Sequence, residues 1–154
     1  MSLRCLTHTG LCVSDLERSV AFYRDVLGFE ELGRLAPDAE TTSHLLGIPD
    51  VDLRAVYLEN DGWRLELLHY ESPGHVGSSE ARPMNGLGLT HLSFRVDDLD
   101  EVIQKLEKAG GRVLEQNVVK IRGGQFRALF ALDPDGTRLE LIDVPGDPRA
   151  MPGS

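Results

Sequence analysis

Four side chains that are able to bind a metal ion occupy matching positions in two similar halves of the chain. His8 and His91 stand 83 residues apart (91 − 8), and Glu66 and Glu140 stand 74 residues apart (140 − 66). Imidazole nitrogens and carboxylate oxygens are common ligands of divalent cations. The spacing therefore predicts a metal site to which each half contributes one histidine and one glutamate.

The two halves are imperfect copies of each other over two separate stretches. Residues 7–16 align with 90–99, and residues 55–68 align with 128–142. A side chain that does chemistry in one copy is then expected at the equivalent place in the other. The repeat indicates two modules rather than one irregular domain.

The composition is typical of a globular protein. Of 154 residues, 41% are hydrophobic and 27% are charged, which suits one domain or two half-size modules with a shared core. The formal net charge of −9 argues against nucleic acid as a partner, because its phosphates would repel the protein. No stretch has the pattern of a membrane span or a secretory signal, so a cytoplasmic location is expected. Cys5 and Cys12 would point to opposite sides of one predicted strand and are not expected to bridge each other.

Each half is expected to fold as a strand, a helix and three further strands. Ser14 opens a capping box that predicts a helix start, and Gly28 predicts the end of that helix. The turn Asn60-Asp61-Gly62 predicts a hairpin, because these residues tolerate positive φ. One helical turn at 42–46 is expected within the loop 36–50. The first module, 3–70, has its predicted elements at 3–13, 14–27, 29–35, 52–59 and 64–70.

The same order of elements returns after a polar connector rich in glycine and proline, residues 71–88. Gly110 and Gly111 predict the end of the second helix, and Asp133-Pro134-Asp135-Gly136 predicts the last turn. A loose tail is expected at 145–154. The second module, 89–144, has its predicted elements at 89–96, 99–109, 112–118, 127–132 and 139–144.

The four candidate ligands all fall on the polar faces of their predicted strands. Successive side chains of a strand point to opposite faces of the sheet, so residues of one parity share a face. The leucines next to Glu66 and Glu140 therefore point away from the glutamates, and the apolar neighbours of His8 and His91 point away from the histidines. If a helix covers the apolar face of each sheet, the polar side chains line the other, concave face.

These motifs resemble the vicinal oxygen chelate superfamily, the group that contains glyoxalases, bleomycin-resistance proteins and extradiol dioxygenases. The resemblance covers residues 3–144 and is carried by the segments 7–9, 14–29 and 133–141. It implies an α+β protein in which two tandem βαβββ modules form curved mixed sheets around a concave cleft. In metal-dependent members the ligands come from the first and fourth strands of each module. The ligands that the resemblance implies here are His8, Glu66, His91 and Glu140.

The set of two histidines and two glutamates is most similar to that of bacterial-type glyoxalase I, and it is close to that of methylmalonyl-CoA epimerase. Glyoxalase I typically holds glutathione with an arginine at the position of Cys12, so this chain departs from the family there. The epimerase has a separate catalytic carboxylate before the third strand, in a region where this chain has His44 and Asp50. Neither activity is therefore carried over as a whole.

The resemblance and the ligand set together predict a divalent-metal-dependent lyase or isomerase of the glyoxalase type. One ion of nickel, cobalt, manganese, zinc or iron per site would hold a small substrate through two adjacent oxygens. Proton transfer would then take place next to the chelated carbonyl. Glu66 or Glu140 is the expected base, with Asp50 or His44 as the alternative.

Two other functions stay open at this stage. An extradiol-type iron dioxygenase would need only His8, His91 and Glu140. A non-enzymatic protein would bind a small molecule, such as a drug, without turnover. This scaffold carries several chemistries, so kinship alone does not select the substrate.

The expected partners are a small-molecule substrate and a second copy of the chain. Arg54 and Arg127 are repeat-equivalent and are candidate contacts for an anionic substrate. A homodimer is expected, and the metal site would lie either within one chain or across the dimer interface by exchange of modules.

Overall fold

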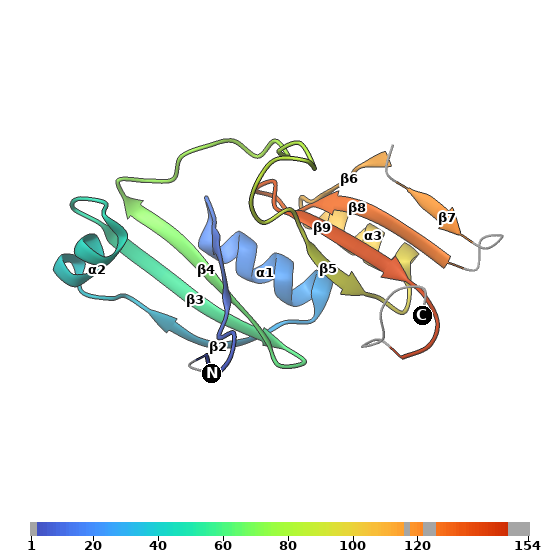
Figure 1. Ribbon diagram of the computed structural model, residues 1–154, viewed down its shortest axis with the longest axis horizontal. Coiled ribbons are helices and arrows are strands. Elements are labelled where there is room, and N and C mark those ends of the chain that lie inside the picture. The colour runs from blue at the N-terminus through green and yellow to red at the C-terminus, as the bar shows by residue number, and fades with distance from the viewer. Residues whose placement is uncertain (1–2, 116–117, 122–125, 148–154) are drawn as a thin grey trace. The chain divides into compact units, whose positions relative to one another are not determined.

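The computed structural model describes residues 3–115, 118–121 and 126–147, and the chain divides into two compact units, Met1–Gly77 and Ser78–Ser154. Each unit has the order strand, helix and further strands that the sequence predicts (Figure 1). The predicted α+β class, with two βαβββ modules, is confirmed. In the described part of the chain, no helix is long and apolar enough to cross a membrane.

The first unit contains a four-stranded mixed sheet. The bounds of its elements are β1 Thr9–Cys12, α1 Leu16–Leu27, β2 Glu30–Leu35, α2 Ala39–Leu46, β3 Asp52–Asn60 and β4 Trp63–Ser72. The strand order is β1-β4-β3-β2, in which β1 is parallel to β4 and the other neighbours are antiparallel. Helix α1 packs against β3 and β4 (Figure 1).

The second unit repeats this arrangement. The bounds of its elements are β5 Leu92–Arg95, α3 Leu99–Lys108, β6 Arg112–Val113, β7 Val119–Ile121, β8 Phe126–Leu132 and β9 Arg138–Asp143. The strand order is β5-β9-β8-β6, with β7 also paired to β8, and β5 is parallel to β9. Helix α3 contacts β6 and β9. The parallel pairs β1–β4 and β5–β9 are therefore equivalent in the two units.

One face of each sheet is apolar and is covered by the helix of its unit. Tyr23 of α1 is fully buried, as are Val56 of β3 and Leu67 of β4. In the second unit Leu106 of α3 and Leu141 of β9 are fully buried as well. Because side chains alternate along a strand, the residues between these core positions point to the face that the helix does not cover.

The start of α1 differs by one residue from the prediction. Asp15, not Ser14, is the N-cap: its carboxylate accepts a hydrogen bond from the Arg18 backbone N–H at 3.0 Å. Ser14 instead accepts a hydrogen bond from the Arg18 guanidinium at 2.7 Å. The predicted end of the helix is confirmed, because Gly28 has the left-handed conformation with φ 70°.

Other boundaries predicted from the sequence also need correction. The helical turn expected at 42–46 belongs to the longer helix α2, which Asp38 caps by accepting a hydrogen bond from the Thr41 backbone N–H. The strand expected at 3–13 is limited to β1, whose four residues all pair with β4. Of the strand expected at 112–118, β6 is the part that the described residues show, and 116–117 lie outside the described residues. A separate short strand, β7, follows, and β6 and β7 pair with different parts of β8. Part of the tail expected at 145–154 lies outside the described residues.

The hairpin predicted around Asp61 and Gly62 is confirmed. Asn60 pairs directly with Trp63, which leaves a two-residue turn. Both turn residues have positive φ, 48° at Asp61 and 80° at Gly62, as a turn that matches the twist of the strands requires. This turn sets the register between β3 and β4 and so places Tyr57 directly opposite Glu66.

Candidate functional site

In each unit one histidine lies beside one glutamate. His8 Nε2 is 3.1 Å from Glu66 Oε2, and His91 Nε2 is 3.5 Å from Glu140 Oε2. Each histidine directly precedes the first strand of its unit, and each glutamate lies on the parallel neighbour of that strand, β4 or β9. The structure thus brings the four predicted side chains together as two pairs, one in each unit.

The strand register explains why each pair forms. Glu66 is aligned with Gly10 of β1, and Glu140 is aligned with Ser93 of β5. Each histidine lies two residues before that partner, so it has the same parity and points to the same face as the glutamate. This is the face opposite to the fully buried leucines of β4 and β9.

A threonine hydroxyl holds the second ring nitrogen of each histidine. Thr7 Oγ1 is 3.0 Å from His8 Nδ1, and Thr90 Oγ1 is 2.9 Å from His91 Nδ1. In the tautomer that carries its proton on Nδ1, the ring donates to the hydroxyl and keeps the Nε2 lone pair for a ligand. The orientation of both rings leaves Nε2 facing the glutamate.

An aromatic ring packs edge-on against each histidine. The ring centroids of His8 and Tyr57 are 5.3 Å apart with an interplanar angle of 86°, and those of His91 and Phe130 are 5.3 Å apart with an angle of 74°. Tyr57 and Phe130 also lie directly opposite the glutamate of their unit in the register. Both aromatic residues therefore flank the whole pair.

The polar neighbours of the two glutamates differ between the units. Ser93 Oγ donates to Glu140 Oε2 at 2.7 Å, whereas the residue aligned with Glu66 on β1 is Gly10, which has no hydroxyl group. Burial, together with the nearby Glu66 carboxylate, raises the pKa of Tyr57 to about 12. The phenol therefore stays protonated, and so remains a hydrogen-bond donor, at neutral pH.

The arginines that stand two residues before the glutamates have other partners. Arg64 Nε donates to Glu59 Oε2 at 2.8 Å across the β3–β4 hairpin. Arg138 is buried and donates to the backbone carbonyls of Thr90 and Arg82. The two arginines therefore do not form the ion pair with Glu66 or Glu140. Each glutamate lies instead beside a histidine, at 3.1 Å for Glu66 and 3.5 Å for Glu140.

The structure does not bring Arg54 and Arg127 to the pairs. Arg54 is aligned with His69, three positions along β3 from Tyr57, and therefore points to the opposite face. Arg54 forms an ion pair with Asp52 at 3.3 Å. Arg127 donates to Asp100 of α3 at 2.7 Å and to Asp143 at 3.0 Å, so it lies on the helix-covered face.

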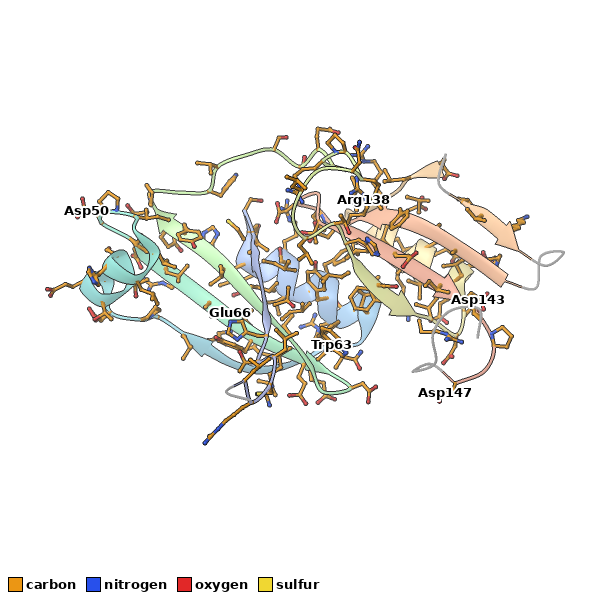
Figure 2. The ribbon with its side chains drawn as sticks, in the orientation of Figure 1. Asp50, Trp63, Glu66, Arg138, Asp143 and Asp147 are labelled. Carbon is orange, nitrogen blue, oxygen red and sulfur yellow. The ribbon has the colours of Figure 1, made fainter. Side chains whose placement is uncertain are left out.

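His44 and Asp50 lie at the far end of the first unit. His44 is exposed on α2, and Asp50 follows that helix with a positive φ of 54°. Figure 2 shows Asp50 well separated from Glu66, which lies midway along β4. Glu66 is aligned with Tyr57, five residues beyond the start of β3, or roughly 16 Å along a strand. Neither residue is brought to the His8–Glu66 pair.

The residues that surround the two pairs were not predicted from the sequence as part of the site. Thr7 and Thr90 share the offset of the two histidines, and Tyr57 and Phe130 are 73 residues apart (130 − 57). The repeat itself was thus the signal that could have identified both sets. Among the described residues, no group of three or more His, Cys, Asp or Glu side chains gathers to hold a metal ion. Each unit by itself presents one pair.

Comparison with known proteins gives consistent matches over nearly the whole chain. A family model described as Glyoxalase/Bleomycin resistance protein/Dioxygenase superfamily matches residues 6–141. The chain is 30% identical to the lactoylglutathione lyase of Haemophilus influenzae over 139 residues, which cover 90% of this chain and 91% of that protein. It is 31% identical to the lactoylglutathione lyase of Neisseria meningitidis serogroup B over 138 residues, 89% of this chain and 88% of that one. The fold is similar to that of a glyoxalase family protein from Bacillus cereus, with a TM-score of 0.79 at 20% identity over 92% of this chain and 95% of the other.

Proposed function

The chain belongs to the glyoxalase/bleomycin resistance protein/dioxygenase superfamily, and we propose that it is a divalent-metal-dependent lyase or isomerase of the glyoxalase type. Its substrate would be a small molecule with adjacent oxygens, and the reaction would transfer a proton next to a metal-chelated carbonyl. The observation that carries this proposal is a His–Glu pair of the same construction in each unit. The similarity to two lactoylglutathione lyases supports this type of chemistry.

The geometry of each pair fits two neighbouring positions around a metal ion. With metal–ligand bonds of about 2.1 Å, two ligand atoms are about 3.0 Å apart at right angles and about 3.4 Å apart at the tetrahedral angle. The observed separations are 3.1 Å for His8–Glu66 and 3.5 Å for His91–Glu140. The threonine contacts at Nδ1 add the outer support that metal-binding histidines usually have.

The chemistry of the donor set also fits a divalent ion of the first transition row. Two imidazoles and two carboxylates would balance the charge of one such ion, and the ion would supply a site for the substrate oxygens. Two nitrogen ligands favour nickel, cobalt, manganese, zinc or iron over calcium and magnesium. The four proposed ligands are His8, Glu66, His91 and Glu140.

A bound divalent ion would polarise the substrate carbonyl and so make the neighbouring C–H group more acidic. Glu66 or Glu140 would accept that proton on a carboxylate oxygen and return it to the adjacent carbon, so that no atom is gained or lost overall. The Ser93 hydroxyl donates a hydrogen bond to the Glu140 carboxylate and so restrains it. The position of Asp50, far along the unit from Glu66, favours the paired glutamates as bases.

The similarity of the two pairs also bears on the alternative functions. An extradiol-type dioxygenase needs two histidines and one carboxylate, which leaves Glu66 without a role at the metal. Glu66 is paired with His8 at least as closely as Glu140 is paired with His91. This favours the four-ligand enzyme over the iron dioxygenase.

A reaction screen tests the proposed function. The protein would be stripped of metal with a chelator, reloaded with nickel, cobalt, manganese, zinc or iron, and incubated in D₂O with methylglyoxal plus glutathione, acyl-CoA thioesters or catechols. We expect metal-dependent turnover that incorporates deuterium next to the carbonyl, which NMR detects. We expect no oxygen uptake. Oxygen uptake with catechols and iron alone would instead identify a dioxygenase. Ligand binding that survives chelation without any turnover would identify a non-enzymatic binder.

Cys12 leads to a prediction about glutathione. It lies on β1 two residues beyond Gly10, so it shares the face of Glu66, and it is exposed. A neutral thiol cannot form the charge-assisted hydrogen bonds of a guanidinium with a carboxylate. We therefore expect poor turnover of the methylglyoxal–glutathione adduct, and a KM for this adduct about 10-fold lower in Cys12→Arg, the effect of one such contact. Cys5→Arg adds the same charge at the other exposed cysteine and is expected to leave KM unchanged.

A further inference from the structure

The helix-covered side of the first unit contains a cavity of about 690 Å³, a size that suits a small-molecule ligand. Arg54 of β3 and His69 of β4 both line it, and the register places them directly opposite each other. His69 has the parity of the buried Leu67, so the cavity lies on the opposite face of the sheet from Glu66. The apolar part of the lining consists of Leu16, Leu35, Ala36, Ala55 and Val56.

The equivalent place in the second unit is occupied by two carboxylates of the chain itself. Arg127, the repeat partner of Arg54, lies directly opposite Asp143 in the register and donates to it at 3.0 Å. Arg127 also donates to Asp100, near the start of α3, at 2.7 Å. Hydrogen bonds between a guanidinium and a carboxylate are strengthened by both charges. The arginine of the second unit thus has two negative partners on the helix-covered face.

The first of these carboxylates has no counterpart in the first unit. The residue equivalent to Asp143 is His69 (143 − 74), which carries no negative charge to offer Arg54. The His69 ring is held in place by donating from Nδ1 to the Val13 carbonyl at 3.1 Å. The strand opposite Arg54 therefore supplies no carboxylate at the position where β9 supplies one.

The second carboxylate is present in the first unit but is bound by another arginine. Glu17 is equivalent to Asp100 (100 − 83), and Arg34 of β2 donates two hydrogen bonds to it. Arg54 meets Asp52, an exposed neighbour on its own strand, at 3.3 Å, and no other carboxylate in the described part of the chain pairs with it. The Arg54 side chain is 46% exposed, whereas that of its repeat partner is 28% exposed. A cavity and an under-used guanidinium thus occur together.

We propose that this cavity binds a small organic carboxylate, which takes the place at Arg54 that two aspartates have at Arg127. The planar guanidinium matches a carboxylate through two parallel N–H donors, and the apolar lining suits a short aliphatic chain attached to that group. The inference goes beyond the proposed function, because this site lies on the other face of the sheet from the His8–Glu66 pair and needs no metal.

The acidic side chains that line the cavity do not replace the missing partners of Arg54. Glu17 is bound as described, and Asp15 caps α1 by accepting a hydrogen bond from the Arg18 backbone N–H. Glu71 lies two residues beyond His69 on β4, at 3.8 Å from its Nε2. A carboxylate ligand would be repelled by Glu71, so Glu71→Gln is expected to strengthen its binding by about threefold, the size of an exposed charge interaction.

Titration of the isotope-labelled full chain with hexanoate, followed by NMR, tests this inference. We expect millimolar binding, with the largest shifts at the backbone amides beside Arg54 and His69, both with and without a chelator. Hexanol has the same chain without the charge, and inorganic phosphate has charge without the chain; both should bind at least about 10-fold more weakly. Arg54→Gln should weaken hexanoate binding by about 10-fold. Arg24→Gln removes an exposed arginine at the other end of α1 and should leave binding unchanged.

Replacement of His69 decides whether the missing carboxylate explains the site. His69→Asp copies the second unit and gives Arg54 a partner within the chain, so hexanoate binding should fall by about 10-fold or more. His69→Asn has nearly the same shape without the charge and should keep the parent affinity within about threefold.

The inference is wrong if hexanoate causes no shifts beside Arg54, if hexanol binds as tightly as hexanoate, or if His69→Asp binds hexanoate as well as His69→Asn does. Phosphate binding as tight as that of hexanoate would overturn the assignment to a carboxylate with an aliphatic chain. A parent protein that binds no metal would contradict the proposed function only, because the titrations in the presence of a chelator judge the cavity separately.

Discussion

Alanine in place of either His8 or Glu140 is expected to abolish metal binding by the whole protein. The parent, dialysed after loading with a divalent metal, should retain about one ion per site, since a four-ligand set of nitrogen and oxygen donors binds tightly. Each variant removes one ligand. The other member of that His–Glu pair then has no second side chain in its unit with which to bind the metal. We expect affinity to fall by more than about 100-fold, the upper limit for residues that only support a ligand. Elemental analysis of the dialysed proteins measures the loss.

The two substitutions are chosen from different units so that their results also test how the ligands combine. If the four side chains bind one ion, His8→Ala and Glu140→Ala each lose all of the metal. If each pair binds an ion of its own, each variant keeps half of the parent content. His75→Ala, an exposed histidine of the connector, is the control and should keep all of it. A parent that stays metal-free after incubation with nickel, zinc and iron contradicts the proposed ligand set.

The pairing of ligand-type side chains could be predicted because it depends on parity and on the repeat. Glu66 alternates with leucines on β4, and that alternation alone places it on the face away from the core. The repeat then transfers the same placement to Glu140. The order of strands and the helix ends depend on local signals such as Gly28 and the turn at Asp61 and Gly62, which have the expected left-handed conformations.

The contacts of the two glutamates with residues of neighbouring strands, and the placement of the arginines, could not be predicted in the same way. Tyr57 meets Glu66 only because β3 and β4 are in one particular register, and Ser93 meets Glu140 only because β5 runs beside β9. Such contacts join residues that are distant in the chain. The charge of Arg54 and its repeat partner favour a substrate contact, but its parity relative to Tyr57 puts it on the other face.

Local errors at element boundaries have a different cause. Ser14 and Asp15 are both good N-cap residues, and only the backbone conformation decides between them, with Asp15 extended at φ −141°. Asp38 and Gly47 are equally clear signals for the ends of α2, yet the nearby prolines favoured a loop. Competing local signals of similar strength are separated by tertiary packing, which a single sequence does not display.

Glutamine in place of Glu66 is expected to reduce kcat far more than it reduces metal binding. The amide keeps an oxygen that can bind a metal and keeps the shape of the side chain, but it cannot accept a proton at neutral pH. For the residue that acts as general base, the loss in kcat is about 10²- to 10⁴-fold. We expect Glu66 to be that residue, because the Ser93 hydroxyl holds Glu140 at 2.7 Å, whereas Gly10, the equivalent residue beside Glu66, has no hydroxyl group. A carboxylate without this hydrogen bond is less restrained and can move toward the substrate.

Glu140→Gln is the matched comparison, since it changes the equivalent side chain in the other unit. Both variants should keep most of their metal in elemental analysis, so a difference in kcat, measured on a substrate identified by the reaction screen, reports proton transfer rather than ligand loss. A larger loss in Glu140→Gln would assign the base to the second unit and would mean that the serine hydrogen bond orients the base instead of restraining it. Equal losses would mean that the two glutamates act in turn, one removing the proton and the other returning it. Adding a hydroxyl group beside Glu66 with Gly10→Ser should lower kcat if movement of Glu66 is part of the reaction, and should leave kcat unchanged if Glu140 is the base.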